Sequence, residues 1–120
     1  MEHYKLIMPE NLNHLGYLYG GYMLKWIDEF AYITANQEFP GNNFLTIALD
    51  NVIFRKSVRS GEIIRFLVER EKLGTTSVQY KVRAYGTRLH NQPDEVLFET
   101  HITFVAVDES GVKRPITRTK

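Results

Sequence analysis

The sequence predicts an α+β fold in which one long antiparallel sheet curls around a single helix. Two observations favour this fold. One segment has helical length and is apolar on most of its circumference, and the segments that follow it have the patterns of long strands. A helix that is apolar nearly all round must be enclosed by the rest of its domain. In a chain of 120 residues, the sheet has to provide that enclosure.

The helix is predicted from Tyr22 to Asn36, directly after Gly20 and Gly21. Its apolar side chains are too many for one narrow stripe at 3.6 residues per turn. They are Met23, Leu24, Trp26, Ile27, Phe30, Ala31 and Ile33. The loop that follows, residues 38–43, contains Pro, Gly and Asn, whose turn chemistry ends the helix.

Five segments have the patterns of strands. A short one, residues 4–8, ends at Pro9, because proline donates no backbone hydrogen bond. In residues 77–85, apolar and polar side chains alternate with the period of a half-buried strand. The other strands are predicted at residues 44–54, 62–72 and 96–107.

Three connections complete the predicted order. Residues 58–61 and 73–76 contain glycine and have turn composition. Residues 89–94 form a polar loop, and residues 109–120 are expected to be a basic, frayed tail. A half-barrel of this kind leaves long edge strands, and such edges are normally closed by pairing with another subunit. We therefore expect at least a homodimer.

Composition and charge exclude several classes of protein. A formal net charge of +1 argues against a nucleic-acid-binding protein, which usually needs a strongly basic face. The absence of cysteine excludes disulfides and thiolate nucleophiles, and it suits the reducing cytoplasm. No segment has the length of about 20 apolar residues that a membrane span requires, and no signal peptide is recognisable. We expect one cytoplasmic domain, residues 1–120, without membrane insertion.

Asp28 has the strongest case for a chemical role. Its neighbours on the predicted helix, including Leu24, Ile27 and Ala31, are apolar. Burying an ionised carboxylate in such surroundings is unfavourable unless the carboxylate has a partner. Asp28 therefore marks either a functional site or an ion pair with a Lys or Arg, and the spacing leaves both possibilities open.

Gly20 and Gly21 stand where the helix begins. Glycine allows a ligand to approach the backbone, and the free N–H groups of a helix N-terminus favour developing negative charge. The alternative is a tight entry turn packed under the sheet. Because Asp28 follows two turns later, we expect an oxyanion donor and a general base that face one crevice.

Asn13 lies in the loop before the helix, where its side chain could orient a water or bond its own backbone. Arg55 and Lys56 belong to a small basic cluster that is either a solvated turn or a contact for a phosphate. The histidines lack the spacing of metal ligands, so no metal is expected. The sequence also lacks a G-x-S-x-G elbow and a phosphate-binding glycine motif.

The segment from Met8 to Glu29 is similar to the signature of the acyl-CoA thioester hydrolase family. These are hotdog-fold proteins that include bacterial YciA-type enzymes and two-domain cytosolic hydrolases. The resemblance is carried by N-x-x-G-x-x-x-G-G, which begins at Asn13, and by the W-x-D motif that ends at Asp28. Weaker matches continue in the family's order as far as Asp108.

The resemblance implies hydrolysis of acyl-CoA, with Asp28 and Asn13 as catalytic residues that meet across a dimer interface. The Gly21 N–H would polarise the thioester carbonyl. Asp28 would either activate water or attack the carbonyl to give an anhydride. CoA is then part of the substrate and product, no cofactor is needed, and the assembly is a homodimer or a trimer of dimers.

Further contacts to the substrate are expected at Gly20, Tyr22, Arg55, Lys56, Ser57, Gly74, Thr75, Thr76 and Ser77. Two of these positions depart from the family, which commonly has proline in place of Ser57 and a basic residue in place of Thr75. The main alternative function is a hotdog protein that binds acyl-CoA as a sensor or carrier without hydrolysing it. An enoyl-CoA hydratase would pair its carboxylate with a histidine, and residues 22–36 contain none.

Overall fold

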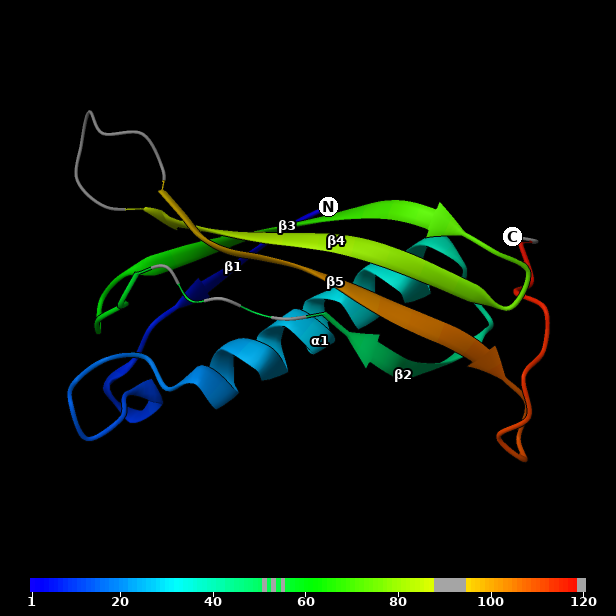
Figure 1. Ribbon diagram of the computed structural model, residues 1–120, viewed down its shortest axis with the longest axis horizontal. Coiled ribbons are helices and arrows are strands. Elements are labelled where there is room, and N and C mark those ends of the chain that lie inside the picture. The colour runs from blue at the N-terminus through cyan, green and yellow to red at the C-terminus, as the bar shows by residue number, and fades with distance from the viewer. Residues whose placement is uncertain (51, 53, 55, 88–94, 119–120) are drawn as a thin grey trace.

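The computed structural model describes residues 1–50, 52, 54, 56–87 and 95–118. All of its strands belong to one antiparallel sheet with the order β1-β3-β4-β5-β2, and the helix α1 crosses one face of this sheet (Figure 1). The predicted α+β fold is therefore confirmed. The elements are β1 (Glu2–Leu6), the 3₁₀ helix η1 (Pro9–Asn11), α1 (Gly20–Glu38), β2 (Asn43–Leu49), β3 (Ile63–Leu73), β4 (Ser77–Thr87) and β5 (Glu95–Val107).

The core fills the space between α1 and the sheet. Alternate residues of β3, such as Ile64 and Phe66, point inward and are completely buried, and so are Ile27 and Ala31 of α1. Each of the pairs β2–β5, β3–β4 and β4–β5 contains a register shift. Such irregularities bend strands and increase their twist, and this explains why the sheet curls over the helix.

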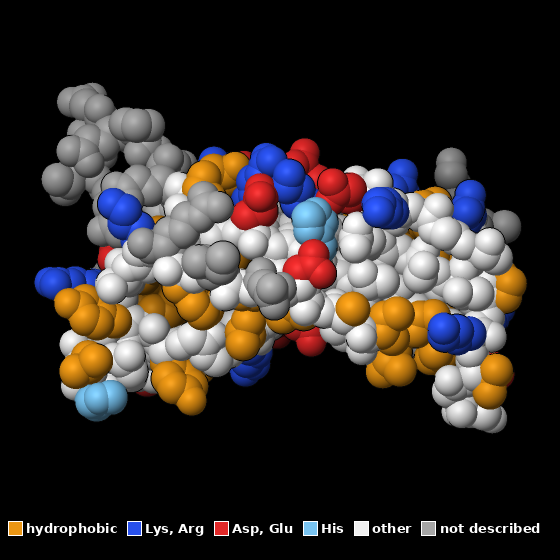
Figure 2. Space-filling model, in the orientation of Figure 1, with side chains coloured by type: hydrophobic (Ala, Val, Ile, Leu, Met, Phe, Trp, Pro, Cys, Tyr) orange, Lys and Arg blue, Asp and Glu red, His pale blue; other side chains and the backbone are white. Residues whose placement is uncertain are grey.

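The helix is longer than predicted, and it is not enclosed on all sides. It begins at Gly20 and ends at Glu38, two residues beyond the predicted limits at each end. Leu24, Tyr32 and Ile33 are 37–43% exposed. The prediction of complete enclosure is therefore wrong for a single chain, because one five-stranded sheet covers only one side of a helix. Figure 2 shows hydrophobic side chains gathered along the edge of the molecule where α1 and β2 lie.

Strand limits differ from the prediction where long-range pairing decides them. The first strand ends at Leu6 instead of residue 8, and the next residue, Ile7, donates its N–H to the Glu62 carbonyl. β2 ends at Leu49, short of the predicted residue 54. The turn at residues 58–61 is present, with Gly61 at φ +90°. Residues 51, 53 and 55 and the predicted loop 89–94 lie outside the described part of the chain.

The C-terminal segment is anchored, so the prediction of a frayed tail is wrong for residues 112–118. Ile116 is only 6% exposed, and its N–H donates to the Thr75 carbonyl at 2.8 Å. The buried side chain of Asn42 exchanges two hydrogen bonds of 2.9 Å with the backbone of Thr117. These partners are distant in the sequence, and local composition therefore gave no sign of them.

Replacing Asn42 with alanine is expected to lower the free energy of unfolding by about 2–3 kcal/mol, because the Phe39 carbonyl and both backbone groups of Thr117 lose their partner. Urea denaturation measures the change. The exposed neighbour Asn43 is a matched control, and Asn43→Ala should change the value by less than about 0.5 kcal/mol. Equal losses in both variants would contradict an anchoring role for Asn42.

Candidate active site

Asp28 lies in the middle of α1 on the side that faces β2. Its Oδ1 accepts a hydrogen bond of 2.7 Å from the Thr46 hydroxyl, and the residue is half-buried. The predicted apolar surroundings are only part of the picture. A groove of about 510 Å³ runs between α1 and β2 and is lined by Lys25, Asp28, Glu29, Tyr32, Phe44, Leu45 and Thr46.

Thr46 is a site residue that sequence reasoning missed. Threonine is common in strands, so its type gives no signal. It stands eighteen positions after Asp28, and only the packing of β2 beside α1 brings the two together. A hydroxyl that donates to one carboxylate oxygen fixes the orientation of the carboxylate and leaves the other oxygen for a water or a substrate.

Asn13 is held by its own loop. Its Oδ1 accepts hydrogen bonds from the N–H groups of Leu15 at 2.9 Å and Tyr17 at 3.2 Å. The backbone bonding that the sequence left open is thus present. Because an amide oxygen has two lone pairs, these bonds use its accepting capacity and leave the amide Nδ2 as the group that Asn13 can offer to a ligand.

A second cavity, of about 320 Å³, lies beside the beginning of α1. It brings together four of the predicted site residues, namely Asn13, Gly20, Lys56 and Ser57. The rest of its lining is mainly apolar and consists of Tyr17, Leu18, Met23, Phe54, Val58 and Leu97. The polar groups converge at one end of an apolar pocket, which is the usual composition of a small-molecule site.

The N-terminus of α1 is suited to hold negative charge. The first N–H groups of a helix have no partner within it, and the preceding residue, Tyr19, makes no side-chain cap. Gly21 is exposed, and a Cβ at this position would lie 2.8 Å from the Tyr19 ring. Glycine is therefore required sterically. The ring of Tyr19 packs edge-on against Tyr22, which in turn contacts Trp26.

Within one chain the predicted catalytic residues are divided between the two cavities. Asn13 and Gly20 line one cavity, and Asp28 lines the other. The seven residues from Gly21 to Asp28 correspond to about 10 Å along the helix axis. The expectation that Gly21 and Asp28 of the same chain face one crevice is therefore not met.

The predicted contacts at Gly74, Thr75, Thr76 and Ser77 form the β3–β4 turn, which lies at the opposite end of the molecule from the start of α1 (Figure 1). Gly74 donates its N–H to the Ser77 carbonyl at 2.8 Å, which closes the turn. The turn is not brought together with the other predicted site residues within the chain. Arg55 lies outside the described residues.

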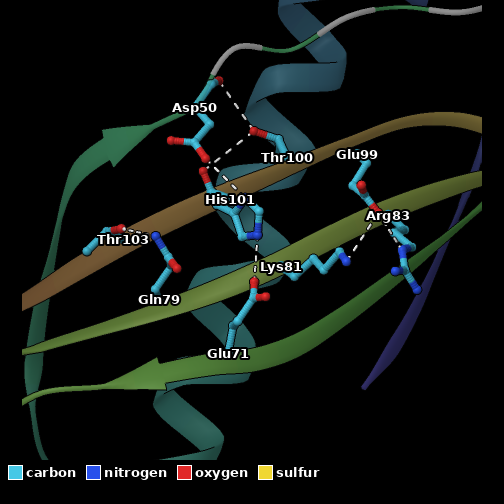
Figure 3. Close-up of polar contacts among 9 residues, drawn as sticks. All are labelled: Asp50, Glu71, Gln79, Lys81, Arg83, Glu99, Thr100, His101 and Thr103. Carbon is cyan, nitrogen blue, oxygen red and sulfur yellow. Dashed lines mark hydrogen bonds and ion pairs between the residues drawn. The ribbon is translucent and has the colours of Figure 1, made fainter.

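A polar cluster occupies the other face of the sheet (Figure 3). His101 contacts Glu71 through Nε2 at 2.6 Å and Asp50 through Nδ1 at 3.0 Å, so it is not isolated as its spacing in the sequence indicated. Arg83, 2.6 Å from Glu99, holds the pKa of that carboxyl below its usual value. This cluster fastens the end of β2 to the sheet and lies away from the groove at Asp28.

Two further findings concern the described part of the chain. No group of three or more His, Cys, Asp and Glu side chains in it is arranged to hold a metal ion. The helix α1 lacks the apolar character needed to cross a membrane, and no other helix in this part of the chain has the length and composition to do so.

The chain resembles known thioesterases along most of its length. The family model of the thioesterase superfamily matches residues 15–88. The acyl-CoA thioester hydrolase YciA of Salmonella typhimurium is 25% identical over 114 residues, which cover 92% of this chain and 85% of that protein.

Two solved structures have nearly the same fold. The hexameric broad-specificity acyl-coenzyme A thioesterase HI0827 is 27% identical, with a TM-score of 0.85 and coverage of 98% of this chain and 80% of that one. The acyl-CoA hydrolase of Staphylococcus aureus, in complex with butyryl coenzyme A, is 26% identical with a TM-score of 0.87, covering 100% and 73%. Further structures of the staphylococcal enzyme carry alanine in place of an aspartate, an asparagine fifteen positions before it and a threonine seventeen positions after it.

Proposed function

Because this chain belongs to the thioesterase superfamily, we propose that it hydrolyses acyl-CoA to a free acid and CoA at a site assembled from two copies of the chain. The observation that carries the proposal is the division of the site. One cavity holds a carboxylate with its orienting hydroxyl, and the other holds an amide donor beside a helix N-terminus. Each contains what the other lacks for the hydrolysis of a thioester.

The edge of the sheet supports the pairing of two copies. β2 is an edge strand in the order β1-β3-β4-β5-β2, and Leu45, Ile47 and Leu49 on it are 38–53% exposed. An apolar edge strand favours pairing with another chain. A two-fold axis beside β2 would place the two α1 helices side by side and the groove of each chain against its partner. The hexameric state of HI0827 favours a trimer of such dimers.

The spacing of the site residues supports the same roles. Asn13 and Asp28 are fifteen positions apart, as are the asparagine and aspartate replaced in the staphylococcal enzyme. Thr46 stands eighteen positions after Asp28, one more than the threonine of that enzyme. The extra position falls in a segment that includes the connection between α1 and β2, where insertions are tolerated.

In the proposed reaction, Asp28 accepts a proton from a water that attacks the thioester carbonyl, and the CoA thiolate leaves. Thr46 orients the carboxylate. Asn13 Nδ2 of the partner chain donates to the water or the carbonyl, and the Gly21 N–H stabilises the oxyanion with the help of the helix dipole. If Asp28 instead attacks the carbonyl directly, an anhydride forms and water then hydrolyses it.

We assign Gly20, Tyr22, Lys56 and Ser57 to the substrate cavity beside the start of α1. The ammonium group of Lys56 suits a phosphate of CoA. The assignments of Arg55 and of the turn Gly74–Ser77 to CoA stay predictions, the latter as contacts from another copy. The cytoplasmic location and the lack of a cofactor also stay predictions.

The test is thiol release from a panel of acyl-CoAs of different chain length, followed with a chromogenic thiol reagent. A hydrolase releases CoA in many turnovers per site. Binding of acyl-CoA without release for any chain length would instead favour the sensor or carrier. Loss of an enoyl-CoA substrate without release of thiol would indicate a hydratase.

Replacing Thr46 with valine, which has nearly the same shape, is expected to lower kcat about tenfold, because the Asp28 carboxylate loses the hydrogen bond that orients it. Steady-state kinetics measures the change. Thr103, which accepts a weak hydrogen bond from Gln79 on the other face of the sheet, is the matched control. If Thr103→Val lowers kcat as much as Thr46→Val, the effect is one of folding and the role of Thr46 is wrong.

A further inference from the structure

We propose that Tyr32 closes the acyl end of the groove beside Asp28 and thereby restricts the enzyme to short acyl chains. Tyr32 can have this role only in an acyl-CoA hydrolase, so the proposal rests on the proposed function. Tyr32 lies one helical turn after Asp28, about 6 Å further along the axis, and both side chains line the same groove.

The groove changes character along its length. Near Asp28 its lining is polar and includes Lys25, Glu29 and Thr46. At the other end it is aromatic, because Tyr32 stands opposite Phe44 of β2. Moving toward the end of α1 therefore means moving toward the beginning of β2, from a polar region into an apolar one.

The aromatic end is supported from below by the core. The rings of Tyr32 and Phe44 lie 6.1 and 6.2 Å from the ring of Phe104, which is completely buried. On the far side, Phe104 packs edge-on against Tyr80, also buried, at 6.2 Å. A close-packed set of rings yields little to a ligand, so this end forms a firm wall.

The polarity of the groove fixes the direction of the substrate. With the thioester carbonyl at Asp28, one arm of the substrate points to the polar end and the other to the aromatic end. The CoA arm carries amide groups, and burying them without hydrogen-bond partners would be unfavourable. The acyl chain therefore points toward Tyr32. At about 1.5 Å per carbon–carbon bond, roughly four to five carbons reach the ring.

The exposure of Tyr32 has a second explanation, which the test must separate. Tyr32 is 43% exposed in the single chain, and a partner chain could cover it. A residue that only stabilises a dimer would change turnover of all acyl-CoAs by the same factor. A wall changes the ratio between long and short chains.

The experiment measures kcat/KM for acyl-CoAs from acetyl to dodecanoyl with three variants of Tyr32. In the wild type, kcat/KM should fall beyond about six carbons. Tyr32→Ala should raise the ratio of decanoyl to butyryl turnover at least about tenfold, because a pocket contact of this size decides such ratios. Tyr32→Trp should lower the ratio of hexanoyl to acetyl turnover, and Tyr32→Phe should leave the whole profile unchanged.

Tyr4, an exposed tyrosine on β1 at the opposite edge of the sheet, supplies the control, and Tyr4→Ala should keep the wild-type profile. An unchanged ratio in both Tyr32→Ala and Tyr32→Trp overturns the proposal while the hydrolase function stands. If Tyr32→Ala fails to fold, Tyr32→Trp and Tyr32→Phe decide alone. A wild-type protein that hydrolyses no acyl-CoA overturns the proposed function itself, which is a different result.

Discussion

Replacing Asp28 with alanine is expected to lower kcat by roughly a hundredfold to ten-thousandfold, the range that a general base contributes, while binding of CoA changes little. Asp28 accepts a hydrogen bond from Thr46 at 2.7 Å and is therefore held in one orientation inside the groove. Its loss removes the group that takes the proton from water, and it leaves the cavity beside the start of α1 intact. Thiol release measures kcat, and calorimetric titration with CoA measures binding.

Glu29 is the control for this prediction, because it is a second carboxylate in the same groove. It is exposed on α1, and Glu29→Gln should lower kcat by less than about threefold, as expected for a solvated surface charge. If Glu29→Gln costs more activity than Asp28→Ala, the two carboxylates have been assigned the wrong way round.

The two roles that remain open for Asp28 can be separated with isotopically labelled water. In a single turnover, an Asp28 that activates water delivers the label directly to the product acid. An Asp28 that attacks the carbonyl gives up one of its own oxygens first and acquires the label itself. Mass spectrometry of the peptide that contains Asp28 distinguishes these outcomes. Asp28→Asn keeps an acceptor for the Thr46 hydroxyl but should be as inactive as Asp28→Ala in either case.

Local patterns in the sequence were sufficient for the elements and for the main carboxylate. The α+β hotdog fold is confirmed by the order and pairing of the strands and by the likeness to known thioesterases. Periods of 3.6 and 2 residues depend on near neighbours, and this is why the helix and the long strands were found with errors of a few residues. Asp28 was found for the same reason, since its apolar neighbours are local.

The features that the sequence did not reveal depend on residues that are far apart. Thr46 meets Asp28 only because β2 packs beside α1. Asn42 holds Thr117 only because the end of the chain returns to the end of the helix. Neither contact has a periodic signal. The exposed apolar side of α1 was read as evidence for complete enclosure within one chain, although the pattern is the same when a second chain covers it.

Asn13→Ala and Asp28→Ala proteins are each expected to be nearly inactive, whereas mixed dimers of the two should recover activity. In a mixed dimer, one site combines Asn13 from one chain with Asp28 from the other and is complete, while the second site lacks both. If chains assort at random, half of the dimers are mixed and half of their sites work, so about one quarter of wild-type turnover returns. Co-refolding of the two variants in equal amounts, followed by thiol release, measures this recovery.

The control mixes two variants from the same cavity. Asp28 and Thr46 come from one chain, so mixing Asp28→Ala with Thr46→Val can never produce a complete site, and turnover should not exceed that of Thr46→Val. Recovery in the first mixture without recovery in the second requires that the carboxylate and the amide of one site belong to different chains. Failure of the first mixture to recover, although both variants remain folded and dimeric, would place Asn13 and Asp28 in a site within one chain. The 10 Å that separates the start of α1 from Asp28 argues against that arrangement, because a single thioester carbonyl must meet the oxyanion donor and the attacking water at the same carbon.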